Sequence, residues 1–194
     1  MIFTATRLKD AFVVDVERRG DERGYLARIY CEREFADHGL VTRFVQASTI
    51  FSPNRDTLRG LHFQTAPHGE VKLVRCTRGA VQVTIVDLRP DSPTHTQWLS
   101  VELSPENGRL LYVPKGFAQG YQTLVDDTEV AYQMSHGYVP ESANGVRWDD
   151  PAFGIEWPPA QQRIISERDR AWPDYETRPR PEARPVPVAS PRGG

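Results

Sequence analysis

The stretch V-K-L-V-R-C-T-R-G-A-V-Q-V-T-I-V-D (Val71–Asp87) decides the fold class. It contains two runs rich in β-branched residues, Val71–Cys76 and Ala80–Asp87, with turn residues between them. Similar short runs recur on both sides of this stretch: Ala11–Val16, Tyr25–Ile29, Phe44–Ile50, Trp98–Leu103, Arg109–Val113 and Glu129–Ser135. Short β-rich runs at such spacing predict an all-β sandwich or barrel.

Helix signals are scarce, so the predicted helices are short and peripheral. One helix is predicted over Cys31–His38, where Gly39 ends it. A second is predicted over Ser166–Ala171, because Ser166 and Asp169 have the spacing of a capping box.

Composition narrows the class of protein. The chain has 194 residues, with 24 Lys and Arg against 26 Asp and Glu and a net charge of −2, which argues against a nucleic-acid partner. No apolar run approaches the ~18 residues of a membrane span, and the first ten residues lack the order of a signal peptide. We therefore expect no membrane partner and a cytoplasmic location.

Composition changes sharply near Thr177, where a run rich in Pro and Arg begins. The run has no apolar periodicity and four Arg against one Glu, which is typical of a solvated, disordered tail. We expect residues 1–176 to form a single domain and residues 177–194 to form the tail.

A lysine and a tyrosine fall on faces that are otherwise apolar. Successive side chains of a strand point to opposite sides, so Lys72 shares a face with Val74, and Tyr132 shares one with Val130 and Met134. Burying either polar group is costly unless it serves a site. The alternative is an ordinary core tyrosine with a bonded hydroxyl and a lysine that reaches solvent at the sheet edge, and each residue taken singly favours it.

The segment G-R-L-L-Y-V-P-K-G-F-A-Q (Gly108–Gln119) is similar to the second sequence motif of cupins, β-barrels that often hold a metal ion. Gly108, Pro114 and Gly116 match the motif's spacing, but Gln119 occupies the place of its ligand histidine. A neutral amide is a poor replacement for imidazole at a first-row metal. The resemblance implies a cupin-type jelly-roll β-barrel.

The first cupin motif is incomplete as well. It requires His-x-His followed closely by Glu, whereas His62 is followed two positions later by Gln64, and Glu70 lies too far along. His68, between Pro67 and Gly69, is interpreted as a loop histidine. We therefore expect a barrel with no metal.

The cluster L-R-G-L-H-F-Q-T-A-P-H-G-E-V-K-L-V-R (Leu58–Arg75) resembles the dTDP-4-dehydrorhamnose 3,5-epimerase family, metal-free cupins that act on nucleotide-linked 4-keto-6-deoxy sugars. The likeness continues through R-G-Y-L (Arg23–Leu26), V-D-L-R-P-D-S-P-T (Val86–Thr94), Y-V-P-K-G-F-A-Q-G-Y (Tyr112–Tyr121), V-R-W-D-D-P (Val146–Pro151) and I-S-E-R-D (Ile165–Asp169). So many ordered segments make the match specific.

Inverting a carbon next to a ketone requires one group that removes a proton and another that returns one to the opposite face. A histidine titrates near neutral pH and suits removal, whereas a phenol keeps its proton at pH 7 and suits return. The resemblance implies that His62 is the base, Asp169 its carboxylate partner, Tyr132 the opposite-face acid and Lys72 the cation that stabilises the enolate.

Residues that bind the nucleotide sugar are also implied by the resemblance. Arg59 and Arg23 match positions that bind the diphosphate, for which arginine forks are suited. Gln46 matches a sugar-contacting position, Gln119 a pocket position, and Tyr138 an aromatic near the base. In the family the R-G-Y-L segment reaches across from a second subunit, which implies a homodimer with exchanged N-terminal strands.

Departures from the family pattern keep alternatives open. Gln119 replaces the pocket histidine and cannot titrate, Tyr121 replaces phenylalanine, and Ser48 replaces the asparagine of Q-x-N-x-S. The leading prediction is a cofactor-independent epimerase of a nucleotide-diphospho-4-keto-6-deoxyhexose. The alternatives are an epimerase of a single carbon and a non-catalytic barrel that binds a nucleotide sugar, with a metal-dependent oxygenase least favoured. The sequence leaves open which nucleotide and sugar are bound and how many carbons are inverted.

Overall fold

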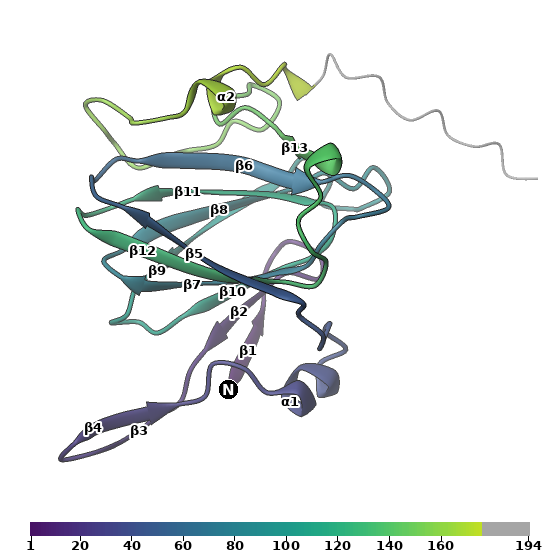
Figure 1. Cartoon of the computed structure of the whole chain (residues 1–194). Coiled ribbons are helices and arrows are strands. Elements are labelled where there is room, and N and C mark those ends of the chain that lie inside the picture. Colours follow the sequence, from purple (N-terminus) through teal and green to yellow (C-terminus); the bar gives the residue numbers. More distant parts are fainter. Residues whose placement is uncertain (176–194) are drawn as a thin grey trace, which may run out of the picture.

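Two antiparallel sheets face each other and form the body of the molecule, which a computed structural model describes over residues 1–175 (Figure 1). The six-stranded sheet has the order β1 (Ile2–Ala5), β2 (Phe12–Asp15), β10 (Leu110–Val113), β7 (Lys72–Arg78), β12 (Thr128–Met134), β5 (Gln46–Ser52). The five-stranded sheet has the order β13 (Ala143–Gly145), β6 (Leu58–Gln64), β11 (Phe117–Thr123), β8 (Val81–Asp87), β9 (Trp98–Leu103). This arrangement confirms the predicted all-β jelly roll.

The main core lies between the two sheets. It joins Val74 and Val130 of the six-stranded sheet to Val83, Ile85 and other apolar residues of the five-stranded sheet. The four valine and isoleucine side chains named here are at most 1% exposed. The alternation expected in β7 and β12 therefore turns their apolar faces inward, and Lys72 and Tyr132 share those faces.

The outer face of each sheet is covered by a different part of the chain. The short helix α1 (Glu32–Asp37) places Phe35 against Leu73 and Tyr112 on the outside of the six-stranded sheet. The segment that follows β13 packs Val146 and Phe153 on the outside of the five-stranded sheet. Both sheets are thus buried on two sides over much of their area, which leaves the space between them to be shaped by inward side chains.

A small hairpin extends away from this body (Figure 1). It consists of β3 (Arg18–Asp21) and β4 (Gly24–Ala27), which pair only with each other among the described strands. Two large apolar side chains of β4 are exposed, Tyr25 at 59% and Leu26 at 71%. The hairpin therefore presents apolar surface that the rest of the described chain does not cover.

Both predicted helices exist, and each is two residues shorter than expected, by one residue at either end. Cys31, predicted as the first helical residue, is the N-cap of α1, and Gly39 follows the C-cap His38. In α2 (Glu167–Arg170), the N–H of Asp169 donates to Oγ of the N-cap Ser166 at 3.1 Å. The expected capping box is nevertheless half formed, because the Asp169 carboxylate accepts hydrogen bonds from His62 and the backbone of Gly60 instead. A short 3₁₀ turn, Pro140–Ser142, precedes β13.

Five strands were not predicted, and two of them form the middle of the five-stranded sheet. These two are β6 and β11, whose residues R-G-L-H-F-Q and F-A-Q-G-Y lack an alternating apolar pattern. They approach each other closely at Gly60 and Gly120. A Cβ at Gly60 would lie 2.7 Å from the Gly120 Cα, and one at Gly120 would lie 2.7 Å from the Arg59 carbonyl oxygen. Glycine is therefore required where the two strands meet.

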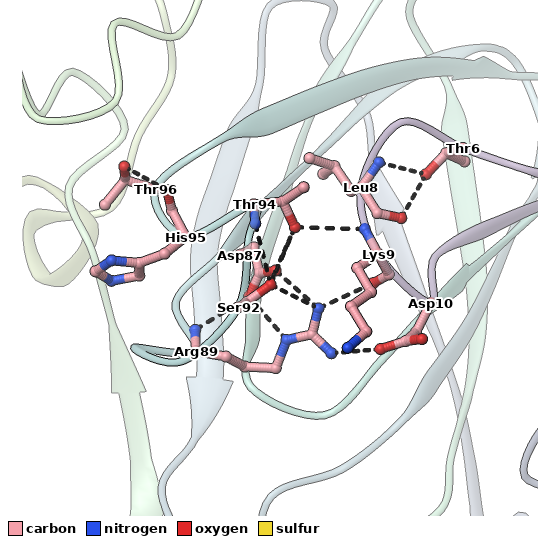
Figure 2. Close-up of polar contacts among 10 residues, drawn as sticks. All are labelled: Thr6, Leu8, Lys9, Asp10, Asp87, Arg89, Ser92, Thr94, His95 and Thr96. Atoms are coloured by element: carbon pink, nitrogen blue, oxygen red, sulfur yellow. Dashed lines mark hydrogen bonds and ion pairs between the residues drawn. The ribbon is translucent and has the colours of Figure 1, made fainter.

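The motif V-D-L-R-P-D-S-P-T forms a polar network that ties the loop after β8 to the N-terminal segment (Figure 2). Asp87 is fully buried and accepts hydrogen bonds from Arg89, Ser92 and Thr94. Arg89 also donates to the Asp10 carboxylate at 2.8 Å. The motif is thus structural in this chain, since it fixes a loop and a terminus to each other.

No helix among residues 1–175 has the length and apolar character needed to cross a membrane. The predicted tail, residues 177–194, lies outside the described residues.

Candidate active site

A cavity of about 570 Å³ opens between the two sheets, at the end of the barrel where β6, β7 and β12 bring their polar side chains together. Eight of the nine site residues predicted from the sequence line it: Gln46, Arg59, His62, Lys72, Gln119, Tyr132, Tyr138 and Asp169. They come from β5, β6, β7, β11, β12, α2 and the loop after β12. The fold thus assembles in one place residues that are up to 123 positions apart, from 46 to 169.

His62 and Asp169 form the tightest polar contact of the cavity. Nε2 of His62 lies 2.6 Å from Oδ1 of Asp169, and Oδ2 of the same carboxylate accepts a hydrogen bond from the Gly60 N–H at 3.0 Å. The Asp169 side chain is 6% exposed, whereas that of His62 is 44% exposed. The carboxylate is therefore a buried anchor, and the imidazole is accessible from the cavity.

The surroundings of Asp169 keep its carboxyl group ionised. Burial raises its pKa, but hydrogen bonding and charge from His62, together with the backbone N–H of Gly60 and the Ser166 hydroxyl, outweigh burial and hold the pKa below its ordinary value. An ionised carboxylate on Nε2 favours the tautomer that carries its proton there. Nδ1 of the neutral imidazole is then free to accept a proton.

Tyr132 and Lys72 enter the cavity from the sheet opposite to His62. Tyr132 belongs to β12, where it pairs with Ser48 and Val74 on the neighbouring strands. Lys72 begins β7, and its Nζ lies 2.9 Å from Oε1 of Glu70 and donates to the His62 carbonyl oxygen at 3.2 Å. Lys72 therefore points inward and does not reach solvent at the sheet edge. A phenol and an imidazole thus face one cavity from two different sheets.

Gln119 lies directly across from His62 in the pairing of β11 with β6. Directly opposed residues of an antiparallel pair share a face, with Cβ atoms about 4.5–5.5 Å apart. Gln119, which replaces the histidine of the family pattern, therefore lies beside the His62 imidazole. Tyr121, the other departure on this strand, is 3% exposed, and burial raises its pKa to about 12, so it does not titrate near neutral pH. Ser48 is not among the residues that line the cavity, whereas Ile50 is.

Two arginines line the cavity. Arg59 on β6 donates from Nε to Oγ of Ser52 at 3.2 Å. Arg168 on α2 lies over the ring of Trp172, with 5.3 Å between its guanidinium carbon and the ring centroid. Gln46 lies at the other end of β5 from Ser52, and its Oε1 accepts a hydrogen bond from the Tyr138 N–H at 2.9 Å. The two guanidinium groups make the cavity suitable for a polyanionic ligand.

Arg23 is the predicted site residue that the cavity does not include. It lies at the turn between β3 and β4, with its side chain 84% exposed and paired with Asp21. Within one described chain, Arg23 and His62 belong to separate regions.

His68 lies in the loop after β6, as predicted, where its Nδ1 is 2.7 Å from Oγ of Ser142. Residues 1–175 contain no group of three or more His, Cys, Asp or Glu side chains placed to hold a metal ion.

Sequence reasoning missed two charged residues of the cavity, Glu70 and Arg168. The metal motif offers no role for Glu70, but this residue stands two positions before Lys72, the spacing at which residues of an extended segment share a face. Arg168 immediately precedes Asp169 in I-S-E-R-D, so the same motif contained the signal.

Comparisons with known proteins give a consistent result. Residues 5–177 match the family model described as dTDP-4-dehydrorhamnose 3,5-epimerase. A curated dTDP-4-dehydrorhamnose 3,5-epimerase of Methanothermobacter thermautotrophicus is 44% identical over 88% of this chain and 92% of the relative. The crystal structure of a dTDP-4-dehydrorhamnose 3,5-epimerase from Bacillus anthracis, with TDP and pyrophosphate bound, superposes with a TM-score of 0.86 at 39% identity. That match covers 89% of this chain and 98% of the other.

A more distant solved structure is a 3′-monoepimerase from Streptomyces bikiniensis in complex with dTDP-quinovose. It superposes with a TM-score of 0.83 at 29% identity, over 89% of this chain and 87% of the other.

Proposed function

Because the chain belongs to the dTDP-4-dehydrorhamnose 3,5-epimerase family, we propose that it inverts carbon centres of a dTDP-4-keto-6-deoxyhexose by removing and returning protons next to the ketone. One observation carries the proposal: His62 and Tyr132 line the same cavity from two opposed sheets. An inversion needs proton transfer on both faces of the sugar ring, and this arrangement provides an imidazole on one side and a phenol on the other.

His62 is the proposed base. With Nε2 held by Asp169 at 2.6 Å, Nδ1 takes the proton from the carbon next to the ketone. The imidazole becomes positively charged, and the ionised Asp169 carboxylate stabilises that charge, as the orienting acid of a catalytic triad does.

Tyr132 is the proposed acid. Its phenol O–H is the proton donor on this side of the cavity and delivers a proton to the opposite face of the ring. Delivery from that face inverts the carbon, whereas return of the proton from His62 restores the starting configuration.

Lys72 is the proposed stabiliser of the intermediate. Between removal and return of the proton, the ketone oxygen carries the negative charge of an enolate. A fixed ammonium group on a side chain that is only 11% exposed stabilises that charge, and one placed donor of this kind typically changes kcat by ~10²–10³.

Arg59, Arg168 and Gln46 are proposed to bind the nucleotide diphosphate and the sugar. Both arginines line the cavity, and planar guanidinium groups bind phosphate oxygens bidentately. Tyr138, whose N–H donates to Gln46, is proposed to contact the substrate beside Gln46.

Incubating the purified full chain with dTDP-4-keto-6-deoxyglucose in deuterated water tests the function, because each inverted centre takes up solvent deuterium. Proton NMR should show loss of the signals at C3 and C5. His62→Ala should abolish exchange at every centre. Tyr132→Phe should leave some exchange without inversion, because the base remains and the returning acid is lost. Absence of exchange in the wild type, together with a melting temperature raised by dTDP, would instead identify a non-catalytic binder.

A second candidate is inversion of a single carbon. It is favoured by Gln119, which lies across from His62 and cannot relay a proton, and by the 3′-monoepimerase among the structural relatives. The same spectra decide the question, since deuterium at one carbon supports the single-centre enzyme and deuterium at two carbons excludes it.

We also propose a homodimer in which the β3–β4 hairpin of each chain reaches the partner's cavity and supplies Arg23 to the diphosphate. The exposed Tyr25 and Leu26 support a contact for this hairpin. Light scattering should give the mass of two chains. The cytoplasmic location expected from the sequence stays a prediction.

Complementation tests the exchange of hairpins directly. In a dimer of one Arg23→Ala chain and one His62→Ala chain, the first chain has an intact His62 and receives Arg23 from the second. Co-expressed variants should therefore recover activity that neither variant has alone. No recovery in isolated mixed dimers would mean that Arg23 does not act across the interface.

A further inference from the structure

Glu70 and Lys72 form a buried ion pair at the wall of the cavity. Oε1 of Glu70 lies 2.9 Å from Nζ of Lys72, and the two side chains are 4% and 11% exposed. Oε2 of Glu70 is buried and has no hydrogen-bond partner within residues 1–175. Of the two carboxylate oxygens of Glu70, Oε1 alone has a partner within the described residues, and that partner is the ammonium group of Lys72.

This pair is costly to keep inside a protein. Removing two charged groups from water costs free energy, on the order of several kcal/mol per ion in proteins. A buried carboxylate oxygen without a hydrogen-bond partner adds to that cost. Apolar residues of similar size would stabilise the barrel at least as well. A buried ion pair in a ligand cavity is therefore better explained by a role in the site than by stability.

The contacts of Lys72 show what Glu70 does to it. An ammonium group has three N–H donors. One is directed at Glu70, and a second donates to the His62 carbonyl oxygen at 3.2 Å. Because the ammonium group is tetrahedral, these two contacts also fix the direction of its third N–H. Because Lys72 lines the cavity, this donor is available to a ligand.

We propose that Glu70 is a positioning residue, which orients the Lys72 ammonium group so that its third N–H meets the substrate ketone oxygen as the enolate forms. The proposal rests on the role proposed above for Lys72. It assigns Glu70 no contact with the substrate and no proton transfer of its own.

The test is a double-mutant cycle on the full chain with dTDP-4-keto-6-deoxyglucose as substrate. Glu70→Gln keeps the size of the side chain and removes its charge, and Lys72→Met removes the ammonium group. If Glu70 acts through Lys72, the Glu70→Gln enzyme should lose about 10- to 100-fold in kcat, since it loses part of what one placed donor provides. Its KM should stay within about twofold, because the enolate charge exists only after binding.

The double variant decides between action through Lys72 and an independent effect. It should have the kcat of Lys72→Met alone, because Glu70 has nothing left to position. Multiplied losses, or an unchanged kcat in Glu70→Gln, would overturn the proposal. An unchanged kcat in Lys72→Met would overturn the role of Lys72 as well, so the two failures are distinguishable.

Two further variants separate positioning from folding. Glu70→Asp retains the charge at a shorter reach and should recover part of the kcat lost in Glu70→Gln. Glu102→Gln makes the same change on the exposed face of β9, away from the cavity, and should leave kcat unchanged. If Glu70→Gln unfolds, the kcat and melting temperature of Glu70→Asp are compared with those of the wild type. A displaced ammonium group should lower kcat with little change in melting temperature, whereas an unchanged kcat would overturn the proposal.

Discussion

Nε2 of His62 and Oδ1 of Asp169 are 2.6 Å apart, although 107 positions separate the two residues in the sequence. The contact depends on how the C-terminal segment joins the barrel. Ile164 lies beside the start of β6, where its carbonyl oxygen accepts a hydrogen bond from the Leu58 N–H at 2.9 Å. The turn into α2 then brings Asp169 over Gly60. The proposed base is therefore oriented only when the last part of the described chain has docked.

Asp169→Asn should lower kcat by about 10²–10⁴ with a small change in KM, because a neutral amide neither fixes the Nε2–H tautomer nor stabilises the charged imidazole. Steady-state assays and deuterium uptake should fall together, since both require proton removal. Glu167→Gln is the matched control, as it changes an exposed carboxylate of the same helix. An Asp169→Asn enzyme with normal deuterium uptake would show that His62 works without its partner.

Gln119→His tests whether the side chain across from His62 limits the number of inverted carbons. A histidine at this position can both accept and donate a proton near the sugar. If the wild type labels one carbon, Gln119→His should label a second one in the deuterium experiment. Gln82→His, on the neighbouring strand β8, is a control for the added imidazole, because residue 82 lies outside the lining of the cavity. Unchanged labelling in Gln119→His would exclude Gln119 as the limit.

The parts of the fold that follow simple periodicity could be predicted from the sequence. Val71–Cys76 and Ala80–Asp87 are strands because their residues pack in the core between two sheets. Strands β6 and β11 could not be found in this way, because Gly60 and Gly120 are selected for close approach of two backbones and leave no apolar alternation.

The site residues that belong to the family pattern could be predicted from the sequence. The residue that forms a buried ion pair with one of them could not. His62 and Lys72 could be named from the motif Leu58–Arg75 and Tyr132 from the family resemblance, and the structure brings them to one cavity. Glu70 could not be assigned, because its significance is a 2.9 Å contact with Lys72 that depends on the turn before β7. Patterns in a sequence indicate which residues share a face, whereas distances between charged groups depend on the packing of loops.

Arg168 should contribute to nucleotide binding although it is absent from the residues named from the sequence. Arg168→Ala should weaken dTDP binding about 10- to 100-fold, the range expected when hydrogen bonds to a charged group are lost. Calorimetric titration with dTDP measures the effect, and Arg168→Lys should restore part of it. Arg170→Ala removes the same charge from the same short helix at a residue that does not line the cavity. Equal affinities of Arg168→Ala and Arg170→Ala for dTDP would exclude the role.

Asp87 should make the stability of the fold depend on acidity. Burial raises the pKa of its carboxyl group, but hydrogen bonds from Arg89, Ser92 and Thr94 outweigh burial and lower the pKa to about 2. Unfolding returns the carboxyl group to an ordinary pKa of about 3.9, so the unfolded state binds its proton first as the pH falls. The stabilisation by Asp87 is therefore complete above about pH 5 and is lost progressively as the pH approaches 2.

Asp87→Asn should consequently cost about 2–3 kcal/mol at neutral pH, through loss of the charge that Arg89 and the two hydroxyls surround, and lower the melting temperature by about 5–10 °C. Melting curves between pH 7 and pH 3 check the sign: wild type and variant should differ most at neutral pH and converge in acid. Asp91→Asn changes an exposed carboxylate of the same loop and should follow the wild type throughout. A gap between wild type and Asp87→Asn that stays constant down to pH 3 would mean that the side chain stabilises the loop by packing and not by its charge.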